Sequence, residues 1–375
     1  MPRIGIMLSG LLPDTANYYA LSIVEALAQQ KEAGVEVAVC SLSDPGINSA
    51  HPHDAEEPAH NQRLSELGVP VHSLNAPLTA ITDEQLTGLN GWIDSGFNVI
   101  VAFGRQCLPY LWLAHTSRVP TVVWLGHEEP DADTAGQLGA LFAVQALRSC
   151  VVDWPREKEA WVLLGIDESR VQVIQPGIEV SQFAHRRHRR VEVLHALGIP
   201  LDAATILLTM PASTTALPLL LTVVNLYLRR DPEAHMFICE AETERSSFAF
   251  EALLQTHTRW LADRARVHAF GPTSLFTKLD LFCAVDGCLL TVAGSYVTPL
   301  TFLQAVASGL SPVIAAGPAP LLLPERAVVA NGEPFPIVKA LEAAINRQRP
   351  LTPDEEGVIT IAEAVKGYLA LTSKV

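Results

Sequence analysis

Short apolar runs alternate with helical patterns along almost the whole chain, and this alternation constrains its fold more than any other feature of the sequence. A clear helical pattern spans Tyr18–Glu32, where the apolar residues fall on one face. Such alternation is typical of βαβ units, in which neighbouring strands run parallel. We therefore predict an α/β protein with mostly parallel sheets. The first strands are expected at Arg3–Leu8, Glu36–Ser41, Val69–Leu74, Val99–Phe103, Thr121–Leu125, Ser149–Asp153 and Val171–Gln175.

The alternation stops and restarts near residue 185, which predicts a domain boundary. The chain has 375 residues, more than a single hydrophobic core usually supports. We expect domains at residues 1–185 and 186–350, followed by residues 351–375 as a C-terminal helix crossing back toward the first domain. Residues 44–62 are expected to form a loop. The second set of strands is expected at Thr205–Met210, His235–Cys239, Val267–Phe270, Gly287–Thr291 and Pro312–Ala315, with helices at Leu217–Arg229, Phe248–Ala265, Thr298–Ser308 and Ile337–Arg347.

The charge balance argues against polyanionic partners. The formal net charge is −14, so phosphate backbones and anionic membranes would repel the chain, and we expect no nucleic-acid partner. The one basic run, His185–Arg190, is interpreted as a solvated linker.

Two long uncharged stretches, Ala203–Leu228 and Gly287–Pro324, have the length of a membrane span. Several prolines break both stretches, and a buried parallel strand followed by a core helix has the same composition. We expect no transmembrane segment. The six cysteines form no CxxC pair and are expected to be buried and reduced. Because the N-terminus shows no pattern of an export signal, a cytoplasmic location is expected.

Two segments resemble family 4 of the retaining glycosyltransferases. In Arg156–Phe183 the shared features are Gly165-Ile166, Val173-Ile174, Pro176-Gly177 and Phe183. The segment Gln304–Ile314 is similar to the family's Glu-Ala helix and the strand that follows it. The resemblance implies the GT-B fold, with two Rossmann-like domains facing a cleft. It also implies metal-independent transfer of a sugar from a nucleotide-sugar bound by the second domain to an acceptor bound by the first.

The charged donor contacts of that family are missing. Its Arg and Lys clamp would fall within Thr209–Leu217, which contains neither residue type, and its glutamate pair would fall at Tyr296 and Gln304. Hydroxyls and backbone amides at a helix start can also hold a phosphate. The candidate donor-binding residues are therefore Gly177, Ser295, Thr298, Thr301 and Gln304. Alternatively, Ser295 and Thr298 only cap the helix.

In the first domain, His127 follows an expected strand, at the sheet edge where open α/β proteins bind ligands. It resembles the family's cleft histidine. His127 and Glu128 are the candidate catalytic residues, with Glu129 and Asp131 as nearby acids, although a solvated acidic loop explains the acids equally well. The candidate residues for the acceptor or a phosphate are Gly10, Asn17 and Arg105. Asn17 can instead cap the following helix, and Arg105 can be a surface residue.

No spacing of residues indicates a bound metal or cofactor. Asp131-Ala-Asp133 mimics a metal-binding DxD motif, but so short a match on a polar loop occurs often by chance, and His51-Pro-His53 is interpreted as loop. The leading hypothesis is an active hexosyl transferase that takes a nucleotide-sugar and an unidentified acceptor. One alternative is a degenerate homologue that acts as a binding or partner subunit, with a protein partner or as a homo-oligomer. Another is a sugar-nucleotide epimerase or hydrolase.

Overall fold

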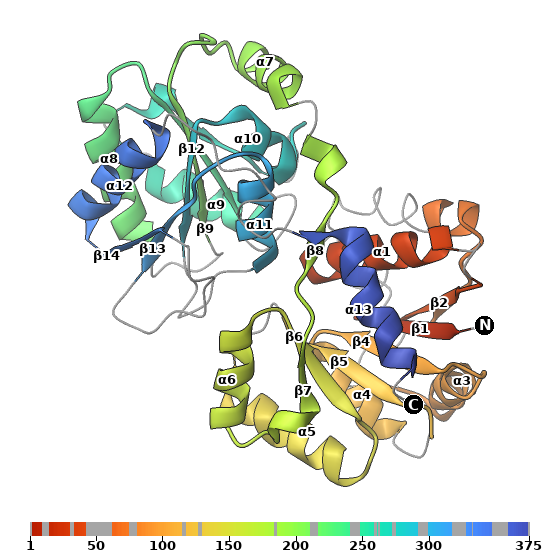
Figure 1. The fold of residues 1–375 in the computed structure, drawn as a ribbon. Helices are drawn as coiled ribbons and strands as arrows, with labels where there is room; N and C mark the ends of the chain where they lie inside the picture. Colours follow the sequence, from red (N-terminus) through yellow and green to blue (C-terminus); the bar gives the residue numbers. More distant parts are fainter. Residues whose placement is uncertain are drawn as a thin grey trace. The chain divides into compact units, whose positions relative to one another are not determined.

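The computed structural model describes residues 2–9, 15–30, 34–42, 62–74, 81–114, 118–126, 130–183, 186–210, 217–240, 248–258, 261, 263–271, 275–291, 299–316, 328–331, 333–346 and 359–373. The chain forms two compact units (Figure 1). Unit 1 comprises Met1–Gly177 and Thr360–Val375, and unit 2 comprises Ile178–Ile359. The chain therefore leaves unit 1 after Gly177 and returns to it at Thr360.

Unit 1 contains a seven-stranded sheet whose strands all pair in parallel, in the order β3-β2-β1-β4-β5-β6-β7. Its central strand β4 is completely buried and β1 is buried after Arg3, as expected where helices cover both faces of a parallel sheet. The elements of unit 1 are β1 (Arg3–Leu8), α1 (Thr15–Gln29), β2 (Glu36–Ser41), β3 (Val71–Ser73), α3 (Asp83–Ile93), β4 (Val99–Phe103), α4 (Leu108–Leu113), β5 (Thr121–Trp124), α5 (Ala132–Ala143), β6 (Ser149–Val152), α6 (Pro155–Leu163), β7 (Val171–Val173) and α13 (Ile361–Ser373).

Unit 2 repeats this plan with six parallel strands in the order β11-β10-β9-β12-β13-β14. The short strands β8 (Gly177–Ile178) and β15 (Ile359–Thr360) pair where the chain passes between the units. The other elements of unit 2 are α7 (Arg186–Ala196), β9 (Thr205–Met210), α8 (Leu217–Arg230), β10 (His235–Glu240), α9 (Phe248–Thr258), β11 (Val267–Ala269), α10 (Lys278–Ala284), β12 (Gly287–Thr291), α11 (Pro299–Ala307), β13 (Val313–Ala316), β14 (Val328–Asn331) and α12 (Pro334–Ile345).

The α/β prediction and most of the expected strands are confirmed. Strands β1, β2, β4, β9 and β12 begin and end at the predicted residues. Strand β14 was not predicted, and helix α9 ends at Thr258, before the predicted Ala265. Each long uncharged stretch contains a buried strand and a helix, and no helix within the described residues is long and apolar enough to cross a membrane.

The interpretation of His185–Arg190 as a solvated linker is wrong. Most of this run forms the first turns of α7, which packs against α10. Arg186 donates to the Val285 carbonyl at 2.7 Å, and Arg190 forms an ion pair with Asp286 at 3.1 Å. The arginines attach α7 to the sheet because they satisfy carbonyl and carboxylate groups that lie far along the chain.

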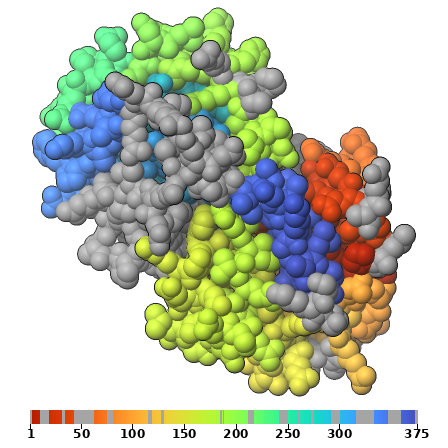
Figure 2. All heavy atoms as spheres, viewed as in Figure 1, coloured from red at the N-terminus to blue at the C-terminus, as the bar shows by residue number. Residues whose placement is uncertain are grey.

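The C-terminal helix α13 belongs to unit 1, where it packs against α1 (Figure 2, blue against red). It begins at Ile361 because Thr360 and Glu363 cap each other: the Thr360 amide donates to the Glu363 carboxylate at 2.8 Å. Residues 351–358, where this helix was expected to begin, lie outside the described residues, as does the loop expected at residues 44–62, apart from Gln62.

All six cysteines lie within the described residues and are buried, as expected, and no disulfide bond joins any of them. Burial raises the pKa of Cys40 and of Cys150 to about 12, so both thiols stay protonated and behave as small apolar residues.

Candidate functional site at the carboxyl edges of the sheets

In both units the strand order reverses beside the first strand, between β1 and β4 in unit 1 and between β9 and β12 in unit 2. Open α/β sheets bind ligands outside the carboxyl ends of the strands at such a reversal. Several buried polar side chains lie at these edges: Asp153 and Glu157 in unit 1, and Thr209, Glu240, Lys278, Thr301 and Gln304 in unit 2.

Lys278 is the most unusual of these residues, because lysine is rarely buried and this side chain is only 1% exposed. It is the first residue of α10, whose start is fixed by reciprocal capping between Thr277 and Asp280. Because α10 follows β11 along the chain, the start of α10 lies on the side of the sheet where the strands have their carboxyl ends. The Lys278 Nζ donates to Thr301 Oγ1 at 3.4 Å.

Thr301 and Gln304 come from α11, which follows β12 and so also begins at the carboxyl edge. They are 2% and 5% exposed, and they lie one turn apart on the same face of the helix. The structure therefore places one predicted donor residue, Thr301, against a lysine that the sequence reasoning missed, with the predicted Gln304 one turn further along α11. The Thr277–Asp280 capping pattern could have located that lysine, because it marks the start of the helix that follows β11.

Gly177 was predicted to let the backbone approach a donor. In the structure the close approach comes from the chain itself: a Cβ on Gly177 would overlap the Thr360 carbonyl and lie 2.6 Å from the Ile361 Cα. The packing of β8 against β15 and the start of α13 therefore explains this glycine.

The other predicted donor and catalytic residues cannot be placed. Gly10, His127, Glu128, Glu129, Ser295 and Thr298 lie outside the described residues. Asn17 belongs to α1, but its side chain is also outside the described part.

Arg105 lies on the surface after β4 and forms an ion pair with Asp131 at 3.6 Å. Asp131 caps α5 by accepting from the Thr134 amide at 2.8 Å, and this bonding with Thr134 is the main reason that its pKa is lowered. Asp133 lies in the first turn of the same helix. The Asp131-Ala-Asp133 sequence is thus a helix start, and within the described residues no group of three His, Cys, Asp or Glu side chains could hold a metal ion.

Asp153 is a second residue that the sequence reasoning missed. It follows β6, is 1% exposed, and accepts a hydrogen bond from the Trp124 Nε1 at 2.8 Å. Burial raises its pKa to about 8, so the carboxyl group is protonated at neutral pH. A Cβ on Gly126 would overlap this carboxyl group, which explains the glycine before His127.

Aromatic side chains surround Asp153. The Tyr19 and Trp124 rings lie 5.3 Å apart, and Phe103 contacts both Trp124 and Tyr368, the latter from α13. Burial is the main reason that the pKa of Tyr19 is raised. The cluster therefore fixes α1, α13 and the strand ends of unit 1 around one neutral acid.

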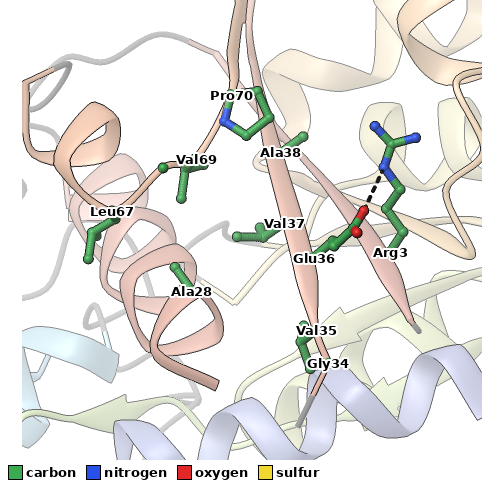
Figure 3. Close-up of a pocket in the computed structure, with 11 residues that line it drawn as sticks. Arg3, Ala28, Gly34, Val35, Glu36, Val37, Ala38, Leu67, Val69 and Pro70 are labelled. Carbon is green, nitrogen blue, oxygen red and sulfur yellow. Dashed lines mark ion pairs between the residues drawn. The ribbon is translucent and has the colours of Figure 1, made fainter. Parts of the chain in front are cut away.

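A separate cavity of about 410 Å³ lies at the opposite, amino edge of the unit 1 sheet (Figure 3). Apolar residues of α1, β2 and the segment Leu67–Pro70 line it, together with the Arg3–Glu36 ion pair at 3.5 Å. It is remote from the carboxyl edge and contains none of the predicted site residues.

No family model and no curated protein matches the sequence. Solved structures match the fold over essentially the whole chain. Anabaena HepE in complex with UDP and glucose has a TM-score of 0.72 at 13% identity, with all of both chains covered. A Rickettsia africae glycosyltransferase has a TM-score of 0.71 at 9% identity, covering 100% of this chain and 98% of that one.

The UDP-GlcNAc 2-epimerase of Neisseria meningitidis bound to UDP-GlcNAc is also similar, with a TM-score of 0.64 at 12% identity over all of both chains. At such low identities the likeness concerns the fold. The fold prediction is confirmed: this chain has the two-domain α/β fold of the GT-B proteins.

Proposed function

We propose that the protein is a glycosyltransferase that moves a hexosyl group from a nucleotide-sugar to an acceptor, with the nucleotide on unit 2 and the acceptor on unit 1. The observation that carries the proposal is the buried Lys278 beside Thr301 and Gln304 at the carboxyl edge of unit 2. The GT-B fold and neighbours solved with UDP or a UDP-sugar support it.

Lys278 supplies the positive charge that is missing after β9. A buried ammonium group forms a short, charge-assisted hydrogen bond to a phosphate oxygen, and its effect is stronger away from water. When the bond between the sugar C1 and the diphosphate oxygen breaks, the electron pair passes to the diphosphate. Lys278 would stabilise this charge, as would the hydroxyl of Thr301 and the amide N–H of Gln304.

The acceptor oxygen then forms the new bond to C1, and its proton passes to a base. His127 and Glu128 are the proposed acceptor-side groups, with Gly10, Asn17 and Arg105 nearby in the sequence-based assignment. The remaining donor contacts are proposed to come from Ser295 and Thr298. Because side chains supply the charge, we propose metal-independent transfer by a family 4-like, retaining mechanism in the cytoplasm.

Binding of nucleotides and nucleotide-sugars, measured by isothermal titration calorimetry, tests the assignment. UDP, GDP and their sugar conjugates are titrated into the wild-type chain, Lys278→Met and Lys339→Met. Lys339 is exposed on α12, so its variant is a matched control. Loss of one charged hydrogen bond predicts about 10- to 100-fold weaker binding for Lys278→Met only. If the wild-type chain binds none of these compounds, or both variants bind like it, the proposal fails.

A second candidate activity is epimerisation or hydrolysis of a nucleotide-sugar, favoured by the similarity to UDP-GlcNAc 2-epimerases. Incubation with UDP-sugars in the absence of acceptor, followed by NMR, distinguishes the activities. An epimerase changes the sugar and a hydrolase releases UDP and free sugar, whereas a transferase needs an acceptor. A binding or partner subunit would bind a nucleotide-sugar or a protein partner without turnover.

A further inference from the structure

The chain runs from the end of β5 directly into the candidate catalytic residues, so the end of β5 determines where they begin. Leu125 is completely buried, and its amide donates to the Val151 carbonyl of β6 at 2.8 Å. Gly126 is also buried and is the last described residue before His127. Because a planar peptide bond joins these two residues, any group that fixes Gly126 also restricts the position of His127.

The side chain of Asp153 contacts this end of β5 at two points. Asp153 follows β6, which pairs with β5 in the sheet (Figure 1). Its Oδ1 accepts a hydrogen bond from the Trp124 Nε1 at 2.8 Å, and its carboxyl group lies so close to Gly126 that a Cβ there would overlap it. A single carboxyl group therefore contacts the residues on both sides of Leu125.

Asp153 is itself held in place. Its backbone amide donates to the Glu157 Oε2 at 2.7 Å, which attaches it to the first turn of α6, and both acids are 1% exposed. The ring of Trp124 in turn packs against Tyr19 of α1 at a centroid distance of 5.3 Å. Asp153 therefore links the end of β5 to α6 and, through Trp124, to α1.

A carboxyl group suits this position only while it is neutral. The titratable groups around it are Tyr19 from α1, Glu157 from α6 and Tyr368 from α13, none of which is a cation. Within the described residues no Lys, Arg or His forms an ion pair with Asp153. Ionisation would place an uncompensated charge against Gly126 and the aromatic rings, which is costly. Loss of the proton is therefore expected to separate the carboxyl group from the end of β5.

We propose that Asp153 is a positioning residue of the acceptor site, which through Trp124 and Gly126 orients the segment that begins with His127. The inference rests on the proposed function, because it takes His127 to serve the transfer reaction. The nucleotide is assigned to unit 2, so Asp153 is not expected to contact it. A change at Asp153 should therefore slow turnover and leave nucleotide affinity unchanged.

NMR of the histidine side chains tests the positioning without any substrate. The His127 Hε1 resonance is identified by its loss in His127→Ala and followed against pH. In the wild-type chain it should shift with its own titration and again near pH 8, where Asp153 loses its proton. The second shift should be absent in Asp153→Asn, which still accepts from Trp124 but cannot ionise. It should persist in the control Asp133→Asn, since Asp133 is an exposed acid in the first turn of α5.

Binding and turnover test the link to the reaction. The probes are UDP, for calorimetry, and UDP-glucose and UDP-GlcNAc, for UDP release with water as acceptor. Asp153→Ala should slow UDP release by about 10- to 100-fold, because a misplaced catalytic group loses its orientation. Its dissociation constant for UDP should stay within about twofold of the wild-type value. Asp153→Asn should keep the wild-type rate at neutral pH and, unlike the wild-type chain, retain it above pH 8.

The two experiments separate the possible failures. If the wild-type chain neither binds UDP nor releases it from either sugar, the proposed function fails, and the NMR response of His127 does not depend on that result. The positioning role is overturned if the His127 resonance shows no shift near pH 8, or if Asp153→Asn keeps that shift. It is also overturned if Asp153→Ala weakens UDP binding as much as it slows UDP release.

Discussion

The two units use the same strand order, yet the carboxyl edge of unit 2 buries a lysine, Lys278, in addition to the acid Glu240. Unit 1 buries Asp153, an acid whose pKa is raised by burial, whereas unit 2 buries Lys278, a cation bonded to a hydroxyl. The sheet topology therefore determines where a ligand can bind, and single side chains determine what charge it meets.

The largest expected effect concerns the buried acid. The pKa of Asp153 is about 8 in the folded chain and about 3.9 in an unfolded one, so the folded state holds the extra proton between these values. This contribution to stability is complete below pH 4 and is lost as the pH rises through 8. Asp153→Asn should match the wild-type free energy of unfolding near pH 4 and exceed it by a few kcal/mol near pH 9.

Urea denaturation at a series of pH values measures this difference. Asp133→Asn is the control, since Asp133 is exposed in the first turn of α5. A difference between Asp153→Asn and the wild-type chain that stays constant with pH would refute the assignment of the buried proton to Asp153.

The next effect tests how tightly unit 1 packs around that acid. Gly126→Ala places a Cβ on the Asp153 carboxyl group and should cost about 1–3 kcal/mol of unfolding free energy by overpacking. Gly136→Ala on α5 should instead be neutral or stabilising, because nothing lies near its Cβ. In an Asp153→Ala background the penalty of Gly126→Ala should shrink, and equal penalties in both backgrounds would contradict direct contact.

Replacing the buried cation of unit 2, Lys278, should weaken nucleotide binding while leaving the free energy of unfolding nearly unchanged. Replacing a buried charge by an apolar side chain of similar volume is often neutral, so Lys278→Met should change the free energy of unfolding by no more than about 1 kcal/mol. It should nevertheless weaken nucleotide binding as described above. A variant that unfolds readily in urea would show that Lys278 serves the fold rather than a ligand.

The smallest expected effect on stability comes from a histidine pair in unit 2. Its pH dependence is opposite to that of Asp153, because stability is lost at low pH. The His235 Nδ1 and His268 Nε2 lie 3.0 Å apart at the amino ends of β10 and β11, and burial, followed by the charge of His235, lowers the pKa of His268 to about 4. The unfolded chain binds this proton more readily, so stability falls as the pH drops from about 6.5 to 4.

His268→Phe should reduce that loss by less than about 1 kcal/mol, because His268 is partly exposed and solvent screens its charge. Urea denaturation at pH 4.5 and 7.5 measures the change, with exposed His195→Phe as the control. If His268→Phe is as acid-sensitive as the wild-type chain, the histidine pair does not contribute to the pH dependence.

The sequence by itself determined the α/β class and most strand positions. A parallel strand covered on both faces is a continuous apolar run, so Arg3–Leu8 and Thr205–Met210 could be located without knowledge of their neighbours. Together with the alternation of strand and helix patterns, the resemblance of Arg156–Phe183 and Gln304–Ile314 to family 4 glycosyltransferases predicted the GT-B fold. The C-terminal end of α9 was less predictable. Helix propensity does not determine the residue at which a helix stops packing against the rest of the fold.

Only the tertiary structure decided which polar side chains are buried and what they contact. Arg190 and Asp286 pair across 96 residues, and Lys278 and Thr301 come from two helices that meet at a sheet edge. Gly177 was a candidate donor-binding glycine in the sequence, yet the space beside it is filled by Thr360, just as the space beside Gly126 is filled by Asp153. Burial and charge are properties of the surroundings of a side chain, and those surroundings are assembled from distant segments only when the chain folds.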